Sequence, residues 1–263
     1  AFEGTIRGLE DENIVVCNGN PIQVIYANSP RDVDYQKFGI DNGILIDNTG
    51  AWRDEDGLNL HLQCPGAAKV ILTAPGKGSI PNIVYGINHN EITQKSKIIS
   101  AASCTTNAIV PILKALQDEF GITRGHVETV HSYTNDQNLI DNYHKGSRRG
   151  RSAALNMVLT ETGAAEAVAK ALPGLKGKLT GNAIRVPTPN VSMAILNLQL
   201  GRETSLEEIN AYVRKMSLHS ALQNQIDYTV SSEAVSSDFV GSRHACIYDA
   251  GATIVNGNSV VLY

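Results

Sequence analysis

The sequence predicts a partial doubly wound α/β domain over residues 1–102, followed by an α+β domain over residues 103–263. Within 43–76, two buried-strand patterns separated by a helical pattern indicate a βαβ unit of a parallel sheet. From residue 126 onward, alternating strand patterns joined by turn residues are typical of a mixed, largely antiparallel sheet. With 263 residues and 42% hydrophobic composition, the chain is long enough to bury two cores.

The first domain is expected to begin with β structure over residues 1–30. Two apolar runs, 14–17 and 21–26, flank Asn18-Gly19-Asn20, a strong hairpin signal because both Asn and Gly tolerate positive φ. The apolar run over 43–50 ends in Thr49-Gly50, as a buried parallel strand does. The other elements expected in this domain are a helix over 53–64 and strands over 67–76, 82–89 and 98–100.

The second domain is expected to combine separate helices with long strands. The strand pattern over 182–200 contains two prolines, which favour an edge strand or a kink. Ser205 and Glu208 form the pattern of a capping box at the start of a helix. Its apolar face is formed by Leu206, Ile209, Val213 and Met216. The other expected elements are a strand over 126–134, a helix over 160–172 and strands over 245–263 around Asn256-Gly257.

Composition excludes several classes of protein. The formal net charge of −4 argues against a general nucleic-acid or membrane-surface binder. No apolar run approaches about 20 residues, and the first residues do not have the pattern of a signal peptide. The four cysteines are scattered without a CxxC spacing, which predicts neither a disulfide framework nor a metal site. We therefore expect a cytoplasmic protein with reduced thiols.

The segment from Lys97 to Phe120 carries the first candidate for chemistry. Its apolar start predicts a strand, and its later residues repeat at the spacing of a helix. Cys104 lies at the junction, where unpaired N–H groups and the helix dipole favour a thiolate. A thiolate is the stronger nucleophile. The alternative from this segment alone is a buried structural cysteine.

A cysteine nucleophile needs a base, and imidazole is the usual one. His131 lies in the strand expected 27 residues after Cys104. With seven histidines in the chain, a chance pairing of one Cys with one His is easy. We expect most of the others to be surface residues or satisfied core residues.

Three features of an acidic chain suggest sites for anions. The run from Lys145 to Arg151 contains Arg148 and Arg149, and guanidinium groups match phosphate oxygens. Thr162-Gly163 precedes a helix, whose first N–H groups hold anions. Arg185 lies in an apolar strand, where an unpaired charge is costly. Together they suggest a phosphorylated substrate, and a solvated loop is the alternative for the basic run.

A dinucleotide site of the usual kind begins with a glycine-rich turn between a strand and a helix. No G-x-G-x-x-G occurs in this sequence, and Gly76-Lys77-Gly78 fits a loop better than a helix start. Thr49, Gly50 and Thr73 nevertheless lie at the carboxyl ends of expected parallel strands, where open α/β sheets bind ligands. The first domain is therefore expected to be part of a dinucleotide-binding domain.

Five ordered motifs resemble phosphorylating glyceraldehyde-3-phosphate dehydrogenases. They are SCTTN (103–107), TVHSYTNDQ (129–137), HKGSRRGRSAA (144–154), TGAAEAV (162–168) and KGKLTGNAIRVPTPNVS (176–192). Weaker likeness runs through NTGAW, KVILTAPG and YGINH upstream. The resemblance implies a Rossmann-like cofactor domain over 1–102 and a catalytic domain over 103–263.

The resemblance also implies roles. Cys104 corresponds to the nucleophile that adds to the aldehyde, and His131 to the base. The positions matching the site for the substrate's own phosphate are Thr134, Asp136 and Arg185. Those matching the site for the attacking phosphate are Ser103, Thr105, Thr162, Gly163 and Arg149, with Arg148 as the neighbouring candidate. Those lining the nicotinamide side are Thr49, Gly50 and Thr73.

The resemblance implies NAD or NADP as cofactor, inorganic phosphate as co-substrate, glyceraldehyde 3-phosphate or a similar aldehyde as substrate, and a homotetramer. The family's glycine-rich first segment and its final W-Y-D-N-E stretch are expected to be missing here, so NAD and NADP are not distinguished. Three alternatives remain at this point: an erythrose-4-phosphate dehydrogenase, a non-catalytic binding or assembly module, and a thiol hydrolase using Cys104 and His131 without a cofactor.

Overall fold

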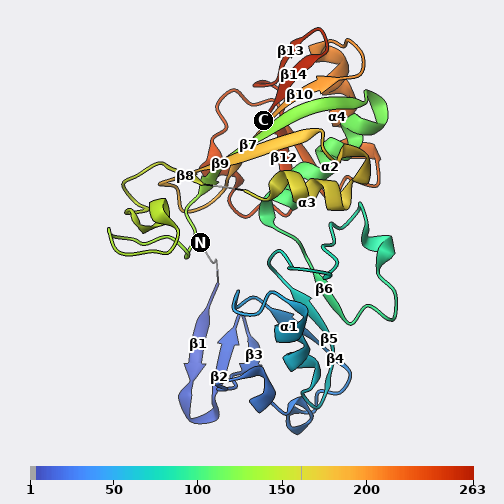
Figure 1. Ribbon diagram of the computed structural model, residues 1–263. Helices are drawn as coiled ribbons and strands as arrows, with labels where there is room; N and C mark the ends of the chain where they lie inside the picture. The colour runs from blue at the N-terminus through green and yellow to red at the C-terminus, as the bar shows by residue number, and fades with distance from the viewer. Residues whose placement is uncertain (1–3, 161) are drawn as a thin grey trace.

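The computed structural model describes residues 4–160 and 162–263. The chain forms two lobes, with the N-terminal residues in one and the helices α2, α3 and α4 in the other (Figure 1). The passage from β6 into α2 connects them. The boundary predicted at residues 102 and 103 falls in this passage.

A three-stranded parallel sheet, in the order β4-β5-β6, forms part of the first lobe. Its strands are β4 (Gly43–Asp47), β5 (Ala67–Leu72) and β6 (Ile98–Ser100). Helix α1 (Glu55–Leu62) lies between β4 and β5 in sequence, and Asp54 caps it by accepting from the N–H of Gly57. Leu58 of α1 packs against Val70 and Leu72 of β5 in a small core. The predicted βαβ unit is therefore confirmed.

Residues 6–23 form a separate antiparallel sheet of three strands. Its strands are β1 (Ile6–Leu9), β2 (Ile14–Cys17) and β3 (Asn20–Gln23). Asn18 and Gly19 join β2 to β3 with φ of 49° and 81°. Positive φ at both positions fits the twist of a two-residue hairpin, as the sequence predicted. Cys17 is a strand residue, but this hairpin does not join the parallel sheet.

The strand predicted over residues 82–89 is wrong. Only Asn82 makes a single bridge, to Ser100, and the residues after it form turns. The amide oxygen of Asn88 accepts from the N–H of Val84 at 2.7 Å, and the Val84 carbonyl accepts from the N–H of Asn88. These bonds close a turn that buries Val84, so the apolar pattern reflects burial and not an extended backbone.

The second lobe is built on a six-stranded sheet in the order β13-β14-β10-β7-β9-β8. Its central strand β7 pairs antiparallel with β10 and parallel with β9. All other pairings in this sheet are antiparallel, so the predicted mixed, largely antiparallel sheet is confirmed. The strands are β7 (Ile122–Ser132), β8 (Val158–Thr160), β9 (Leu179–Val186), β10 (Met193–Leu200), β13 (Ile254–Asn256) and β14 (Ser259–Leu262).

Pro187 and Pro189 lie in the loop between β9 and β10. Each of these strands has a neighbour on both sides, so the predicted edge strand is wrong. The prolines instead end one inner strand before the next begins, because proline has no N–H to donate to a ladder.

Helices α2 (Cys104–Glu119), α3 (Ala164–Ala171) and α4 (Leu206–His219) share one core with the large sheet. Ser205 caps α4 as predicted by accepting from the N–H of Glu208. The carboxylate of Glu208 accepts from Arg202 and Thr204, so the box is formed on one side only. A parallel pair, β11 (Ile226–Thr229) and β12 (Cys246–Asp249), packs beside this core.

Short 3-10 turns join several of these elements. They are Glu10–Glu12, Pro30–Asp32, Tyr35–Phe38, His89–Glu91, Ser147–Gly150, Pro173–Leu175 and Ser236–Phe239. Over the described residues, no helix combines the length and the apolar character that crossing a bilayer requires.

Leu113→Ala tests the packing of α2 on the large sheet. Leu113 is fully buried in the main core, so its truncation leaves a cavity and should lower the free energy of unfolding by about 2–5 kcal/mol. Urea unfolding followed by circular dichroism measures the change. Leu155→Ala is the control, because Leu155 is 82% exposed and should change stability by less than about 0.5 kcal/mol. Equal effects of the two variants would contradict this packing.

Candidate active site around Cys104

Cys104 is the first residue of α2, four residues after Ser100, which ends β6. Ser103 caps the helix, and its Oγ accepts from the N–H of Thr106 at 3.0 Å. Ala102, which is buried, has a φ of 60°. A positive φ is rare for a residue with a Cβ and turns the chain sharply from strand to helix. Cys104 therefore lies at the strand–helix junction that the sequence predicted, and it is exposed, not the buried structural cysteine of the alternative.

His131 of β7 lies opposite Cys104. Its Nε2 is 3.4 Å from the Sγ of Cys104. The hydrogen bond with His131 lowers the pKa of the Cys104 thiol to about 7, against desolvation, which raises it. The charge of His131 and a backbone N–H at Thr105 lower it further. A thiol with this pKa is substantially ionised at neutral pH.

The other histidine of β7 has a different environment. His126 lies five residues before His131, and successive side chains of a strand alternate between faces. Its ring nitrogens contact Thr180 Oγ1 at 2.8 Å and Asn182 Oδ1 at 3.2 Å. His126 is therefore a satisfied structural residue, and only His131 of these two contacts the thiol.

Arg185 of β9 contacts both His131 and Thr134, and Thr134 marks one end of the site. Its Nη1 is 2.7 Å from Nδ1 of His131, 3.0 Å from the carbonyl oxygen of Ser132 and 3.2 Å from Thr134 Oγ1. Its Nε is buried without a hydrogen-bond partner among the described residues. Burial lowers the pKa of Arg185, and the nearby carboxylate of Asp136 opposes that shift. The guanidinium therefore retains N–H groups for an oxyanion.

Asp136 and Arg149 form an ion pair next to this end. Thr134 Oγ1 also donates to Asp136. Burial acts to raise the pKa of Asp136, but the Thr134 hydrogen bond and the charge of Arg149 hold it below its ordinary value. Nη2 of Arg149 donates to Thr160 Oγ1 at 3.1 Å, so both of its terminal nitrogens are engaged.

A pocket of about 400 Å³ brings most of the predicted residues together. Of the predicted set it contains Ser103, Cys104, Thr105, His131, Thr134, Thr162, Gly163 and Arg185. Its wall also includes six residues that were not predicted from the sequence: Arg53, Pro75, Thr129, Ala164, Ala167 and Ala183. Asp136 and Arg149 lie behind the wall, in contact with Thr134 and with each other.

Thr49, Gly50 and Thr73 lie outside the pocket wall, at the carboxyl ends of β4 and β5. Asp47 at the end of β4 accepts from the N–H and the hydroxyl of Thr49, both at 2.8 Å. Its second carboxylate oxygen is 2.9 Å from Nε2 of the buried His61. Burial acts to raise the pKa of Asp47, but these contacts with Thr49 and His61 hold it below its ordinary value.

The sequence offered one signal for Arg53, which directly follows the NTGAW motif that was singled out for the cofactor side. Thr129 and Ala183 lie within two of the motifs that carry the resemblance, 129–137 and 176–192, but no role was predicted for either. They are register partners on β7 and β9, and this pairing brings them to the pocket together. Within 4–160 and 162–263, no three His, Cys, Asp or Glu side chains are grouped as a metal site requires.

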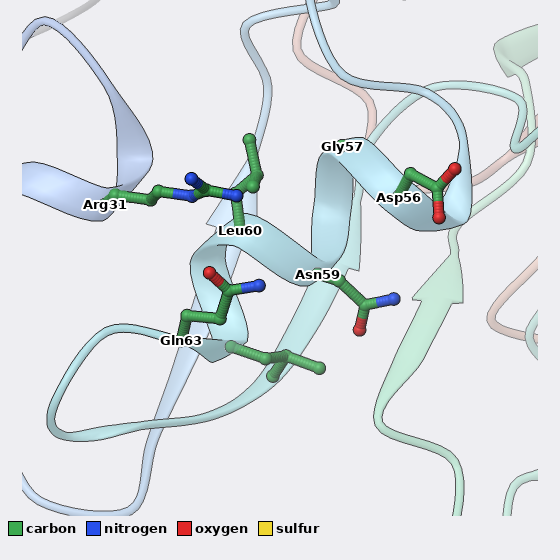
Figure 2. Close-up of a pocket in the computed structure, with 7 residues that line it drawn as sticks. Arg31, Asp56, Gly57, Asn59, Leu60 and Gln63 are labelled. Carbon is green, nitrogen blue, oxygen red and sulfur yellow. The ribbon is translucent and has the colours of Figure 1, made fainter.

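A second depression of about 640 Å³ runs along α1 (Figure 2). Arg31 and Gln63 lie at one end of it, and Asp56 lies at the other. It is lined by Arg31, Asp56, Gly57, Asn59, Leu60, Leu62 and Gln63. None of these is a nucleophile or a base placed beside one, so the smaller pocket at Cys104 is the candidate active site.

The second lobe matches a known family. The C-terminal domain of glyceraldehyde 3-phosphate dehydrogenase matches residues 103–262. A "Glyceraldehyde-3-phosphate dehydrogenase-like protein" of Pseudomonas aeruginosa is 68% identical over all of this chain, which spans 57% of that relative's length.

Two further relatives carry the name of the dehydrogenase itself. "Glyceraldehyde-3-phosphate dehydrogenase 2" of Trichormus variabilis is 43% identical over 95% of this chain and 73% of its own length. "Glyceraldehyde-3-phosphate dehydrogenase A, chloroplastic" of Zea mays is 42% identical over 99% of this chain and 63% of its own length. The chain therefore belongs to the glyceraldehyde-3-phosphate dehydrogenase family.

Proposed function

We propose that the chain carries the catalytic part of an NAD- or NADP-dependent phosphorylating aldehyde dehydrogenase. The substrate is glyceraldehyde 3-phosphate or a similar small phosphorylated aldehyde, and the product is an acyl phosphate. The observation that carries the proposal is the 3.4 Å contact between Cys104 and His131, in a pocket that also holds Arg185. Family membership supports the same reaction.

The contacts of His131 are compatible with either tautomer, and the resting site is proposed to use the one in which Nδ1 carries no proton. Arginine always donates, so Nδ1 of His131 accepts from Nη1 of Arg185. The ring proton then lies on Nε2, where it points to Sγ of Cys104 and stabilises the thiolate. The thiolate adds to the aldehyde carbon and forms a hemithioacetal.

The oxidation step needs His131 in its other tautomer. With Sγ bonded to carbon, Nε2 is required as the base that takes the hydroxyl proton of the hemithioacetal. The carbonyl oxygen of Ser132, 2.7 Å from Nδ1, is placed to accept the ring proton in that form. A bound nicotinamide would supply the acceptor for the hydride, and the part of Cys104 itself is to keep the resulting acyl group as a thioester.

Two sets of groups support sites for phosphate. Thr134, Asp136 and Arg185 are proposed for the substrate's own phosphate, and Arg149 compensates the charge of Asp136 there. Ser103, Thr105, Thr162, Gly163 and Arg149 are proposed for the attacking phosphate, and all of them except Arg149 line the pocket. The N-terminus of α3 follows Gly163 directly and favours an anion at this side.

We also propose that residues 1–102 are part of a doubly wound dinucleotide-binding domain. Doubly wound sheets are covered on both faces, whereas here α1 covers one face and Ile44 and Ile46 of β4 are 63% and 61% exposed. Thr49, Gly50 and Thr73 would hold the nicotinamide side of the cofactor. The space beside Gly50 is open, because a Cβ added there would meet no atom within 4 Å.

A homotetramer is the proposed assembly. Five large apolar side chains lie exposed in the segment between β7 and β8 and at its end: Leu139, Ile140, Tyr143, Leu155 and Met157. Apolar side chains grouped on one segment favour a contact between copies of the chain. All four cysteines are free thiols, which supports the proposed cytoplasmic location.

The pH dependence of Cys104 alkylation tests the thiol–imidazole pair. Because its pKa is lowered to about 7, the thiolate and the labelling rate with iodoacetamide should rise through pH 7. His131→Leu should move this midpoint upward, toward about 8.5 for an ordinary thiol. Mass spectrometry of the labelled peptides measures the rates.

The chain supplies controls for this experiment. His126→Leu removes the other histidine of β7 and should leave the midpoint unchanged. Cys246, whose pKa burial raises to about 12, should label more slowly than Cys104 at every pH below that value. A Cys104 midpoint that stays in place in His131→Leu would contradict the pair.

The reaction itself is tested with the intact gene product. We expect reduction of NAD or NADP by glyceraldehyde 3-phosphate that depends on inorganic phosphate, and a loss of at least about 1,000-fold in Cys104→Ser. Cys17→Ser is the control and should retain full activity. Erythrose 4-phosphate as the better aldehyde would identify the related dehydrogenase instead. Acyl-phosphate hydrolysis without nucleotide would favour a thiol hydrolase, and no reaction at all would favour a binding module.

Sedimentation velocity tests the assembly. Ile140→Asp should shift the protein from the tetramer toward smaller species, because it buries a charge in the proposed contact. Leu218→Asp is the control on α4, since Leu218 is 51% exposed and lies outside the segment. A monomeric wild-type protein, or a tetramer unchanged by Ile140→Asp, would show that this segment does not join the subunits.

A further inference from the structure

We propose that Arg53 is a binding residue for the phosphate that attacks the thioester, contributed to the pocket by the opposite lobe. This inference rests on the proposed function and deepens it. Arg53 lies between β4 and α1, yet it lines the same pocket as Cys104. It is the only cationic residue that the N-terminal lobe adds to the described pocket wall.

Two bonds hold the guanidinium of Arg53 at the wall. Its Nε and Nη2 both donate to the carbonyl oxygen of Pro75, at 3.2 and 3.1 Å. The carbonyl oxygen of Arg53 accepts from the N–H of Lys77 at 2.8 Å, which also ties the backbone to the same loop. The side chain is half-buried, and Pro75 is itself part of the wall. The plane of the guanidinium is therefore fixed before an anion arrives.

The remaining donors of Arg53 are not used by the part of the chain that the structure describes. Nη1 makes no hydrogen bond there, and no carboxylate forms an ion pair with Arg53. The described pocket wall contains no Asp or Glu. A half-buried cation with free N–H groups and no counter-charge favours an anion in the pocket.

Arg53 is better placed for this role than Arg149. Both terminal nitrogens of Arg149 are engaged, with Asp136 and Thr160, and Arg149 does not line the pocket. Nη1 of Arg185 is directed to His131 and Thr134, at the end proposed for the substrate's own phosphate. Of these three arginines, only Arg53 both lines the pocket and makes no contact with a carboxylate or with His131.

The chemistry of the second step explains why a cation is needed. A phosphate oxygen attacks the thioester carbon, the carbon–sulfur bond breaks, and Cys104 leaves as a thiolate while the acyl phosphate forms. The attacking group is an anion, and the leaving group takes up the electron pair as a second anion. A guanidinium at the wall of this pocket offsets the charge of the attacking phosphate and lowers the energy of the transition state.

Arg53→Leu in the intact gene product tests the role through phosphate. The KM for phosphate should rise by about 10-fold or more, because a hydrogen bond to a charged group is lost. Two other quantities should stay within about 2-fold of their wild-type values, since neither depends on the attacking phosphate. They are the KM for the aldehyde and the rate of the first turnover of cofactor reduction, measured without phosphate. Arg53→Lys keeps the charge but not the fixed guanidinium plane, so its KM for phosphate should lie between those of the wild type and Arg53→Leu.

A second readout does not depend on turnover. Iodoacetate is an anion of nearly the same size as the neutral iodoacetamide. A cation in the pocket therefore raises the alkylation rate of Cys104 with iodoacetate relative to its rate with iodoacetamide. That ratio should fall by about 3-fold or more in Arg53→Leu, and the phosphate concentration that protects Cys104 from iodoacetamide should rise by about 10-fold. Arg31→Leu is the matched control, because Arg31 lies on the depression along α1 and is exposed (Figure 2).

The two readouts separate the possible failures. A wild-type protein without phosphate-dependent turnover would refute the proposed function, while the alkylation ratio would still decide whether Arg53 binds anions. An unchanged phosphate KM together with an unchanged alkylation ratio in a folded Arg53→Leu protein would overturn the role of Arg53. If Arg53→Leu does not fold, Arg53→Gln and Arg53→Lys carry the same comparison.

Discussion

The contact between Cys104 Sγ and His131 Nε2 is the point on which the rest of the site depends. It exists only if two distant parts of the chain are held at fixed positions. The strained turn at Ala102 starts α2 where the thiol is exposed. The pairing of β7 with β9 and β10 fixes His131 in the middle of a sheet. A strand that pairs with a neighbour on each side moves little, so the position of the His131 ring is preorganised. The exposed thiol of Cys104 is the more adjustable partner.

Much of the fold follows from local patterns that tertiary packing did not override. The hairpin at Asn18-Gly19, the βαβ unit and the helix capped by Ser205 were all predicted, because turn, period and cap each have a local cause. The strand predicted over residues 82–89 is absent for a reason that the spacing of apolar residues does not reveal. The Asn88 side chain closes a turn around apolar residues, and burial in a turn gives the same apolar run as burial in a strand.

The candidate site was predictable to a different degree. Cys104, His131 and Arg185 stand in motifs whose residue types have a chemical reason to be there, and the structure brings all three to one pocket. Thr129 and Arg53 were not predicted to line the pocket. Strand register brings Thr129 there, and the approach of the N-terminal lobe brings Arg53. Arg149 was expected at the attacking-phosphate site. It pairs with Asp136 and is not part of the pocket wall, and ion-pair geometry has no signal in sequence.

Arg185 gives this arrangement a consequence for how the site can change. The same Nη1 contacts the ring of His131 and the hydroxyl of Thr134, so one nitrogen touches both the proposed base and the proposed site for the substrate's phosphate. On the proposed function, substrate range and pH–rate profile are therefore linked properties, because a change at Arg185 alters the charge of the phosphate site and the hydrogen bond to the proposed base together.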